Sequence, residues 1–484
     1  MAHNKDYLYV DISASHPEVT GSFIICSVHY RNKHYEREVV NFAVDAGLYQ
    51  EKSYIGRNSE MPIKANELDF ILVTHSHIDH IGRLPFVVKN GFRDEIYTTN
   101  TTKLYIEPAL KDTVKIQALD NKKPLYTNED VEKTVEHVVG CDFYTTIELV
   151  PEIITATFFP NGHLLGAAVI LVQITTPYDG SINLLFTGDY NSQNEFFEVP
   201  DLPQYVLEMP INIISEATYG KTNSSEAKPC FKQILSDGTH SKKNIVVPVF
   251  SQGRGQLIQY LVKEMQEDDE ISEHYPVYID GTLLQTYTYM HEHLDLGIFE
   301  DKRNVRPNNS HEITYENRQE IINSPDKKSK IVITSAGMGT NGPAPMHIAS
   351  VLPDRNGLII FTGYQAEGTL GRILQETLYG QKVIIEGREV IKKATVVYTT
   401  EFSSHAKADE LIAFLNKFSN LKSVSINHGS YESKNAFLER VANEVSTKNV
   451  SILEESCSFR YNPYGLVKKF WIPKKSLYMR LFLF

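Results

Sequence analysis

Residues 75–80, His-Ser-His-Ile-Asp-His, follow directly on the apolar run Phe-Ile-Leu-Val at 70–73. The apolar run predicts a buried strand, so the polar side chains are expected on the loop at its C-terminal end. Loops at such positions often carry the function of a fold. Imidazole and carboxylate are ligands of zinc-like metals, and His-x-His places two nitrogens side by side for one ion. The stretch therefore predicts most of a two-metal hydrolase site.

The size and charge of the chain limit its class. At 484 residues it is too long for one hydrophobic core, and two or three domains are expected. A hydrophobic content of 42% is typical of folded, globular protein. The net charge of −12 excludes a generally basic nucleic-acid-binding surface. A polyanionic substrate would have to be attracted locally, by metal ions and a lined cleft.

The chain shows no sign of membrane insertion or of disulfide bonding. No apolar run approaches the roughly 18 residues that a membrane helix needs, and the first residues do not resemble a signal peptide. The four cysteines lie far apart and form no Cys-x-x-Cys unit. We therefore expect a soluble, cytoplasmic protein with no membrane partner. The tail from Leu466 is rich in lysine and aromatic residues, and we expect it to pack on the body rather than to act as an anchor.

The rhythm of the sequence changes along the chain. Short β-prone runs dominate up to about residue 219, for example 22–28, 39–44 and 182–186. Beyond this point short strands alternate with amphipathic helices such as 256–267, which predicts a parallel sheet with covering helices. From about residue 395 histidines again follow strand-like runs. The pattern predicts a first domain in two segments, 1–219 and 393–460, an inserted α/β domain at 220–392, and a tail at 461–484.

Three polar residues at other strand ends complete the expected metal site. His163, Asp189 and His428 each follow a short apolar run and stand next to glycine-containing turns. Two ions about 3.5–4 Å apart would share a water of lowered pKa, and this two-metal-bound hydroxide would be the nucleophile. Two zinc ions are expected, with manganese as the alternative. The predicted ligands are His75, His77 and His163 for one ion, Asp79, His80 and His428 for the other, and Asp189 as the bridge.

With these motifs the sequence resembles the metallo-β-lactamase superfamily, and specifically its β-CASP branch of nucleic-acid-processing nucleases. The likeness covers the chain to about residue 460 and includes bacterial ribonucleases and the endonuclease subunit of pre-mRNA 3′-end cleavage. Asp45, Glu216 and His405 match further motifs of that branch. The resemblance implies a metallo-β-lactamase αββα sandwich with an inserted α/β β-CASP domain. It also implies that Asp45 orients metal ligands without binding metal itself.

The same resemblance assigns catalytic roles. His405, polarised by Glu216, would contact the scissile phosphate and protonate the departing ribose oxygen, and Asp79 would act with them. His428 favours RNA, because the family commonly has valine there in DNA-processing members. Within the insertion, Ser251, Arg254 and Ser335 lie in segments that resemble the ribonucleases and are candidate phosphate-binding residues. Structural turns explain these three segments almost as well.

Two departures from the family pattern concern fine positioning. Lys407 and Ser430 stand where the family usually has the Asp of His-Ala-Asp and the Glu of His-Gly-Glu, respectively. Neither change removes a predicted metal ligand.

The sequence therefore predicts a metal-dependent ribonuclease that cuts single-stranded RNA, compatible with a homo-oligomer. A DNA-processing nuclease of the same branch and a non-catalytic scaffold subunit of an RNA-processing complex are the alternatives. A small-molecule hydrolase would need neither Glu216, His405 nor the inserted domain. A metal-storing or metal-sensing role fits a small buried site poorly.

Overall fold

The computed structural model describes residues 7–16, 18–119, 124–224, 230–302, 304–323, 329–399, 401–447, 449–455 and 457–471. The chain divides into two compact units. The first comprises residues 1–193, 199–225 and 404–484, and the second comprises residues 194–198 and 226–403. The second unit is therefore an insertion into the first, and each is described by itself.

The first unit contains two sheets. One has eight strands in the order β23-β22-β1-β2-β3-β4-β5-β6, and the other has seven in the order β21-β20-β11-β10-β9-β8-β7. The strands of the first sheet are β1 (Tyr9–Ala14), β2 (Ile24–Arg31), β3 (Arg37–Val44), β4 (Phe70–Leu72), β5 (Ile96–Thr99), β6 (Val138–Cys141), β22 (Cys457–Asn462) and β23 (Gly465–Trp471). Those of the second are β7 (Thr146–Val150), β8 (Ile154–Pro160), β9 (Ala168–Thr176), β10 (Gly180–Phe186), β11 (Ile211–Ser215), β20 (Leu421–Ile426) and β21 (Val450–Ile452).

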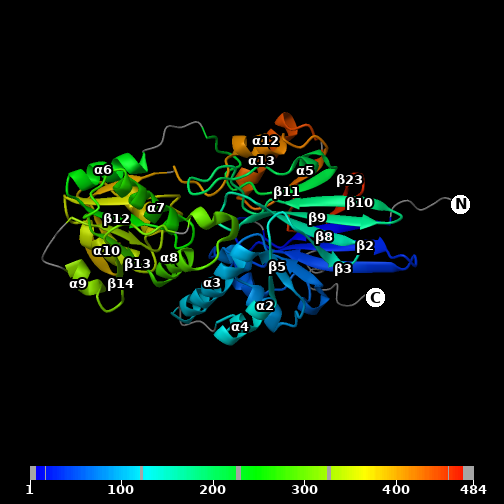
Figure 1. The fold of residues 1–484 in the computed structure, drawn as a ribbon, viewed down its shortest axis with the longest axis horizontal. Helices are drawn as coiled ribbons and strands as arrows, with labels where there is room; N and C mark the ends of the chain where they lie inside the picture. The colour runs from blue at the N-terminus through cyan, green and yellow to red at the C-terminus, as the bar shows by residue number, and fades with distance from the viewer. Residues whose placement is uncertain are drawn as a thin grey trace. The chain divides into compact units, whose positions relative to one another are not determined.

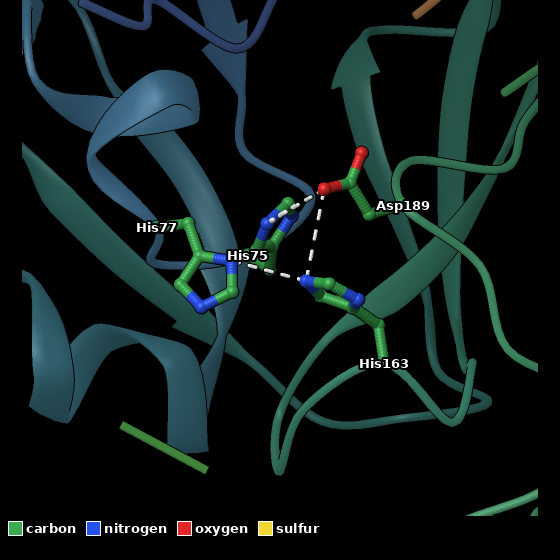
Figure 2. Close-up of side chains that lie close together, drawn as sticks. All are labelled: His75, His77, His163 and Asp189. Carbon is green, nitrogen blue, oxygen red and sulfur yellow. Dashed lines mark hydrogen bonds and ion pairs between the residues drawn. The ribbon is translucent and has the colours of Figure 1, made fainter. Parts of the chain in front are cut away.

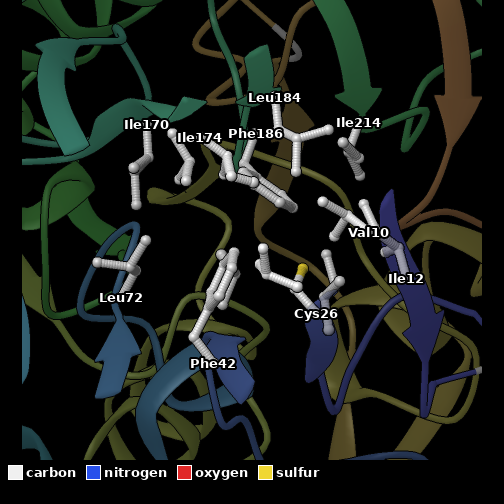
Figure 3. Close-up of a cluster of buried hydrophobic side chains, with 14 of the residues drawn as sticks. Val10, Ile12, Cys26, Phe42, Leu72, Ile170, Ile174, Leu184, Phe186 and Ile214 are labelled. Carbon is white, nitrogen blue, oxygen red and sulfur yellow. The ribbon is translucent and has the colours of Figure 1, made fainter. Parts of the chain in front are cut away.

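The main core of this unit lies between its two sheets (Figure 3). Alternate residues of each strand enter it, because successive side chains of a strand point to opposite faces. Phe42 of β3 and Leu72 of β4 face the core from one sheet, and Ile170 of β9 and Leu184 of β10 face it from the other. In inner strands such as β4, β9 and β11 the residues between them pack on the outer sides, so both faces of these strands are largely apolar.

Helices cover the two outer sides, which gives four layers in the order helix, sheet, sheet, helix (Figure 1). On the first sheet lie α2 (Leu84–Lys89), α3 (Asn100–Leu119) and α4 (Asn128–Glu136). On the second lie α5 (Gln204–Glu208), α12 (Ala408–Leu415) and α13 (Tyr431–Glu444). The predicted αββα sandwich is thus confirmed.

The second unit is built on a parallel six-stranded sheet in the order β14-β13-β15-β12-β16-β19. Its strands are β12 (Asn244–Pro248), β13 (Val277–Asp280), β14 (Ser310–Ile313), β15 (Ile331–Thr334), β16 (Gly357–Phe361) and β19 (Thr395–Tyr398), with a hairpin of β17 (Lys382–Ile385) and β18 (Arg388–Ile391). Its helices are α6 (Phe231–His240), α7 (Arg254–Glu267), α8 (Thr282–His293), α9 (Arg318–Asn323), α10 (Ala344–Val351) and α11 (Leu370–Glu376). The α/β insertion is therefore observed.

Three boundaries differ from those expected. The main segment of the second unit begins at residue 226 rather than at 220. The second unit ends at Ser403 rather than at residue 392, because β19 pairs with β16 of its sheet. Residues 465–471, placed in a C-terminal tail by the sequence, form β23 and pair with β22. β23 is an edge strand, and lysines are common on edge strands because they discourage pairing with another chain. The same lysines interrupt the apolar pattern by which a strand is recognised in a sequence. The rest of the predicted tail, 472–484, lies outside the described residues.

None of the helices in the described parts of the chain is both long and apolar enough to cross a membrane.

Candidate metal centre

The motif at 75–80 leaves the C-terminal end of β4 and enters the short helix α1 (Ile78–Ile81). Its backbone packs tightly against neighbouring loops. Ser22 donates its backbone N–H to the carbonyl of Asp79 at 2.9 Å. A Cβ atom on Gly47 would lie 1.5 Å from the same carbonyl oxygen, so a side chain there would displace the motif. The close approach explains a glycine at 47 and fixes the position of the loop.

A first group of ligand-type side chains converges where this loop meets two others (Figure 2). The Nε2 atom of His163 lies 3.0 Å from Nδ1 of His77. The Oδ2 atom of Asp189 lies 3.6 Å from Nε2 of His75 and 3.7 Å from Nε2 of His163. His163 follows β8 and Asp189 follows β10, as the sequence predicts. The four residues form one group of mutually close donor atoms.

A second group shares Asp189 with the first and adds Asp79, His80 and His428. The other carboxylate oxygen of Asp189, Oδ1, lies 3.3 Å from Nε2 of His80 and 3.2 Å from Nδ1 of His428. Asp79 lies at the rim, with Oδ2 3.9 Å from Nε2 of His80 and 4.0 Å from Nε2 of His428. Asp189 therefore presents one oxygen to each group.

His405 and Glu216 form a pair beside these groups. Nδ1 of His405 lies 3.0 Å from both carboxylate oxygens of Glu216, and Nε2 lies 3.8 Å from Oδ2 of Asp189. The backbone N–H groups of Tyr190 and Thr218 donate to Glu216 and fix its carboxylate. Burial opposes the charged form of His405, but Glu216 and then Asp189 outweigh it and raise the pKa of His405 to about 9.

Asp45 supports the second group from behind. Its Oδ2 lies 2.7 Å from Nδ1 of His80, which directs Nε2 of that ring to the cluster. Thr74 donates both its backbone N–H and its hydroxyl to the same carboxylate. On the other side, Nδ1 of His163 lies 2.7 Å from the carbonyl oxygen of Ser404. A carbonyl only accepts, so this nitrogen carries the proton and Nε2 offers its lone pair.

The protonation states of His75 and His163 fit a cation at this place. Burial, the largest cause, lowers the pKa of His75 and His163 well below its usual value, so both rings are neutral. His80 differs: burial opposes its charged form, but Asp189 and Asp45 raise its pKa. The buried atoms Nε2 of His75, His80 and His428 and Oδ1 of Asp189 have no hydrogen-bond partner of normal geometry among the described residues, although Oδ1 lies within ion-pair distance of His80 and His428. Buried polar atoms rarely lack partners, and cations in the two ligand groups would satisfy all four. The His/Asp cluster fits a metal site.

Sequence reasoning missed three residues that orient the cluster. Thr74 and Thr218 bond the imidazoles of His75 and His428 through their hydroxyls, at 3.0 and 3.1 Å. Their position next to predicted site residues was a usable signal. Ser404 contributes only its carbonyl, and because any residue has one, no pattern could reveal it.

The three candidate phosphate-binding residues belong to the second unit. Arg254, at the start of α7, donates its guanidinium N–H groups to the carbonyls of Thr362 and Phe402 and lies over the Phe402 ring. Ser335 follows β15 and is nearly buried, with 9% of its surface exposed. Ser251 accepts a hydrogen bond from Gln256 through its carbonyl. None of the three belongs to a metal-type cluster among the described residues.

Comparison with known proteins identifies three domains along the chain. Residues 43–143 match the metallo-beta-lactamase superfamily, and residues 255–374 match the Beta-Casp domain. Residues 390–453 match the Zn-dependent metallo-hydrolase RNA specificity domain. The first and third matches contain the motif at 75–80 and His428, and the Beta-Casp match lies within the second unit.

Similar whole proteins carry related names. Transcription termination factor FttA of Pyrococcus horikoshii is 31% identical over 410 residues, which cover 78% of this chain and 60% of that protein. FttA of Methanosarcina mazei is 28% identical, covering 73% and 56%. A ribonuclease of Thermus thermophilus is 26% identical, covering 77% and 84%. The chain thus spans about three fifths of the termination factors. These matches together show that the chain belongs to the β-CASP branch of the metallo-β-lactamase superfamily.

Proposed function

We propose that this protein is a metal-dependent ribonuclease that hydrolyses phosphodiester bonds of single-stranded RNA. One observation carries the proposal: Asp189 presents a carboxylate oxygen to each of two ligand groups, with the His405–Glu216 pair beside it. The match to an RNA specificity domain and the name of the Thermus relative support RNA as the substrate.

The ligand assignment follows the two groups. His75, His77 and His163 would hold one zinc ion, Asp79, His80 and His428 would hold a second, and Asp189 would contact both. When bound, such cations supply Lewis acidity, which lowers the pKa of a water and neutralises charge on a phosphate. Asp45 and the carbonyl of Ser404 orient the rings of His80 and His163, so Nε2 of each ring points to the cluster before any ion binds.

His405 would act as the general acid. Its Nδ1 faces Glu216, and its Nε2 faces the cluster near Asp189. With its pKa raised to about 9, the ring holds a proton near neutral pH and can release it from Nε2 to the departing ribose oxygen. The two backbone N–H groups on Glu216 keep the carboxylate in place, so the acid is positioned before substrate arrives.

The test is a reconstitution assay. Protein stripped with EDTA is supplied with zinc or manganese and given single-stranded RNA labelled at the 5′ end, with a DNA strand of matched sequence in parallel. We expect cleavage of RNA only after metal is added, and the product sizes distinguish internal from terminal cuts. Preferential cleavage of DNA would establish the DNA-processing alternative. No cleavage of either strand by metal-loaded protein would favour the scaffold.

A further inference from the structure

One face of the first sheet, at the end away from the metal centre, carries a row of cations and aromatic rings. Strand register places them together: Tyr9 pairs with His29, Arg31 with Arg37, and Arg460 with Lys468. These side chains alternate with the core residues Val10, Val28 and Phe459, so they point to the opposite face. We call this set the basic ladder, and its members are Tyr7, Tyr9, His29, Arg31, Arg37, Arg460, Lys468 and Phe470.

The members of the ladder contact one another across five strands, β1, β2, β3, β22 and β23. The guanidinium of Arg460 lies 3.8 Å from the centre of the Tyr9 ring and 5.0 Å from that of Phe470. Lys468 lies over the same Phe470 ring at 4.5 Å, and His29 stacks on Tyr9 at 4.4 Å. At the hairpin end, Arg31 and Arg37 lie 4.6 and 4.7 Å from the centre of the Tyr7 ring. The result is a continuous series of planes and positive charges.

The charge of this surface opposes that of the chain. The ladder holds the cations of Arg31, Arg37, Arg460 and Lys468, and the carboxylate that pairs with it is Asp11. Asp11 accepts two hydrogen bonds from Arg460, at 2.8 and 2.7 Å, and so fixes the guanidinium plane. In a chain with a net charge of −12, this is a local excess of positive charge. It attracts a polyanion that the rest of the surface repels.

We propose that the basic ladder is a second binding site for single-stranded RNA. Proteins bind single strands with a basic track for the phosphates and with rings or guanidinium planes on which bases stack. The ladder offers both on one sheet face. The positive charge of the ladder favours a polyanion as its ligand. The planar rings and guanidinium groups favour a polyanion with flat bases, and so favour RNA over an acidic peptide.

The position of the ladder suggests its role. Arg37 begins β3, and Asp45 of the metal centre follows the end of the same strand, about 25 Å away at the rise of an extended chain. An RNA held on the ladder could therefore present a distant part of the same strand for cleavage. This role rests on the proposed ribonuclease function, whereas RNA binding by the ladder does not.

The test measures binding without cleavage. Anisotropy of a fluorescein-labelled 30-nucleotide RNA is titrated with protein in EDTA, which prevents turnover. We compare the wild type with the triple variant R31Q/R37Q/K468Q, which leaves the Asp11–Arg460 pair intact. The control K64Q/K133Q/K417Q removes three exposed lysines elsewhere in the same unit. We expect the ladder variant to bind about tenfold more weakly, with a slope of log affinity against log salt smaller by about two. The control should lose much less affinity.

Equal binding and equal salt dependence of the wild type and the ladder variant would overturn the proposal. Displacement of the RNA by polyglutamate at equal charge concentration would also overturn it, because the surface would then bind anions in general.

Cleavage assays separate this proposal from the proposed function. With metal restored, the ladder variant should cut a six-nucleotide RNA as well as the wild type does but show a higher KM for the 30-nucleotide RNA. If the wild type cuts no RNA, the ribonuclease proposal fails while the binding result still decides whether the ladder binds RNA.

Discussion

The Nδ1 atom of His405 lies 3.0 Å from both carboxylate oxygens of Glu216. This contact leaves Nε2 facing the cluster, where the proposed general acid would act. Replacing His405 with alanine should lower kcat for RNA cleavage by about 10²–10⁴-fold and leave the metal content unchanged. A time course of RNA cleavage measures kcat, and elemental analysis measures the metal content. Replacement of the exposed His34 with alanine is the control. If His405→Ala cleaved RNA at the wild-type rate, His405 would not be the general acid.

The same pair predicts a pH dependence. Burial opposes protonation of His405, and Glu216 is the main group that raises its pKa to about 9. The acid form is therefore present at neutral pH and is lost as pH rises through that value. Glu216→Gln removes the negative charge, so the alkaline limb of the kcat profile should move to lower pH. If the alkaline limb of the kcat profile did not move in this variant, and its metal content were preserved, a group other than His405 would be responsible for that limb.

Asp45 should affect metal affinity without binding metal itself, because it contacts the proposed ligand His80. It has a positive φ of 61°, which asparagine tolerates well, so Asp45→Asn should keep the fold. The variant replaces the carboxylate that contacts Nδ1 of His80 with an uncharged amide, which is a weaker acceptor. Metal affinity should therefore fall by about 10–100-fold. Competition with a chelator of known zinc affinity measures the change. A metal affinity equal to that of the wild type would show that His80 does not need the Asp45 carboxylate in order to bind metal.

Gly47 predicts a steric effect on the motif loop. Gly47→Ala would place a Cβ 1.5 Å from the carbonyl oxygen of Asp79, so the loop must shift. We expect a loss of about 1–3 kcal/mol in the free energy of unfolding, together with weaker metal binding. Gly56→Ala is the matched control, because no atom of the described residues other than its chain neighbours lies within 4 Å of its added Cβ. Urea unfolding of both variants measures the difference, and equal stabilities would contradict the close packing.

Much of the fold and site could be predicted because the strands follow simple rules. The period-two pattern of β9 and β10 places Ile170 and Leu184 in the core, and apolar residues between them indicate a second covered face. The polar residues at 163, 189 and 428 each come directly after such a strand. The C-terminal ends of parallel neighbours lie at one edge, so distant residues meet there.

Other features depend on tertiary contacts that no local pattern records. Nothing in the sequence indicates that His163 bonds the backbone carbonyl of Ser404, more than two hundred residues away. Arg254 is similar: its charge suggested a phosphate ligand, but its guanidinium is bonded to two carbonyls of its own unit. The lysines of β23 hide an edge strand. Each of these features depends on contacts that form only in the folded tertiary structure.

The central claim is that Asp189 joins two metal-binding groups. The most direct test is the metal-to-protein ratio of the purified wild type and of Asp189→Ala, measured by inductively coupled plasma mass spectrometry. We expect two equivalents per chain in the wild type and less than one in the variant, because both groups lose a ligand. Asp268→Asn, a change at an exposed carboxylate, should keep both equivalents. Two equivalents retained by Asp189→Ala would contradict the account.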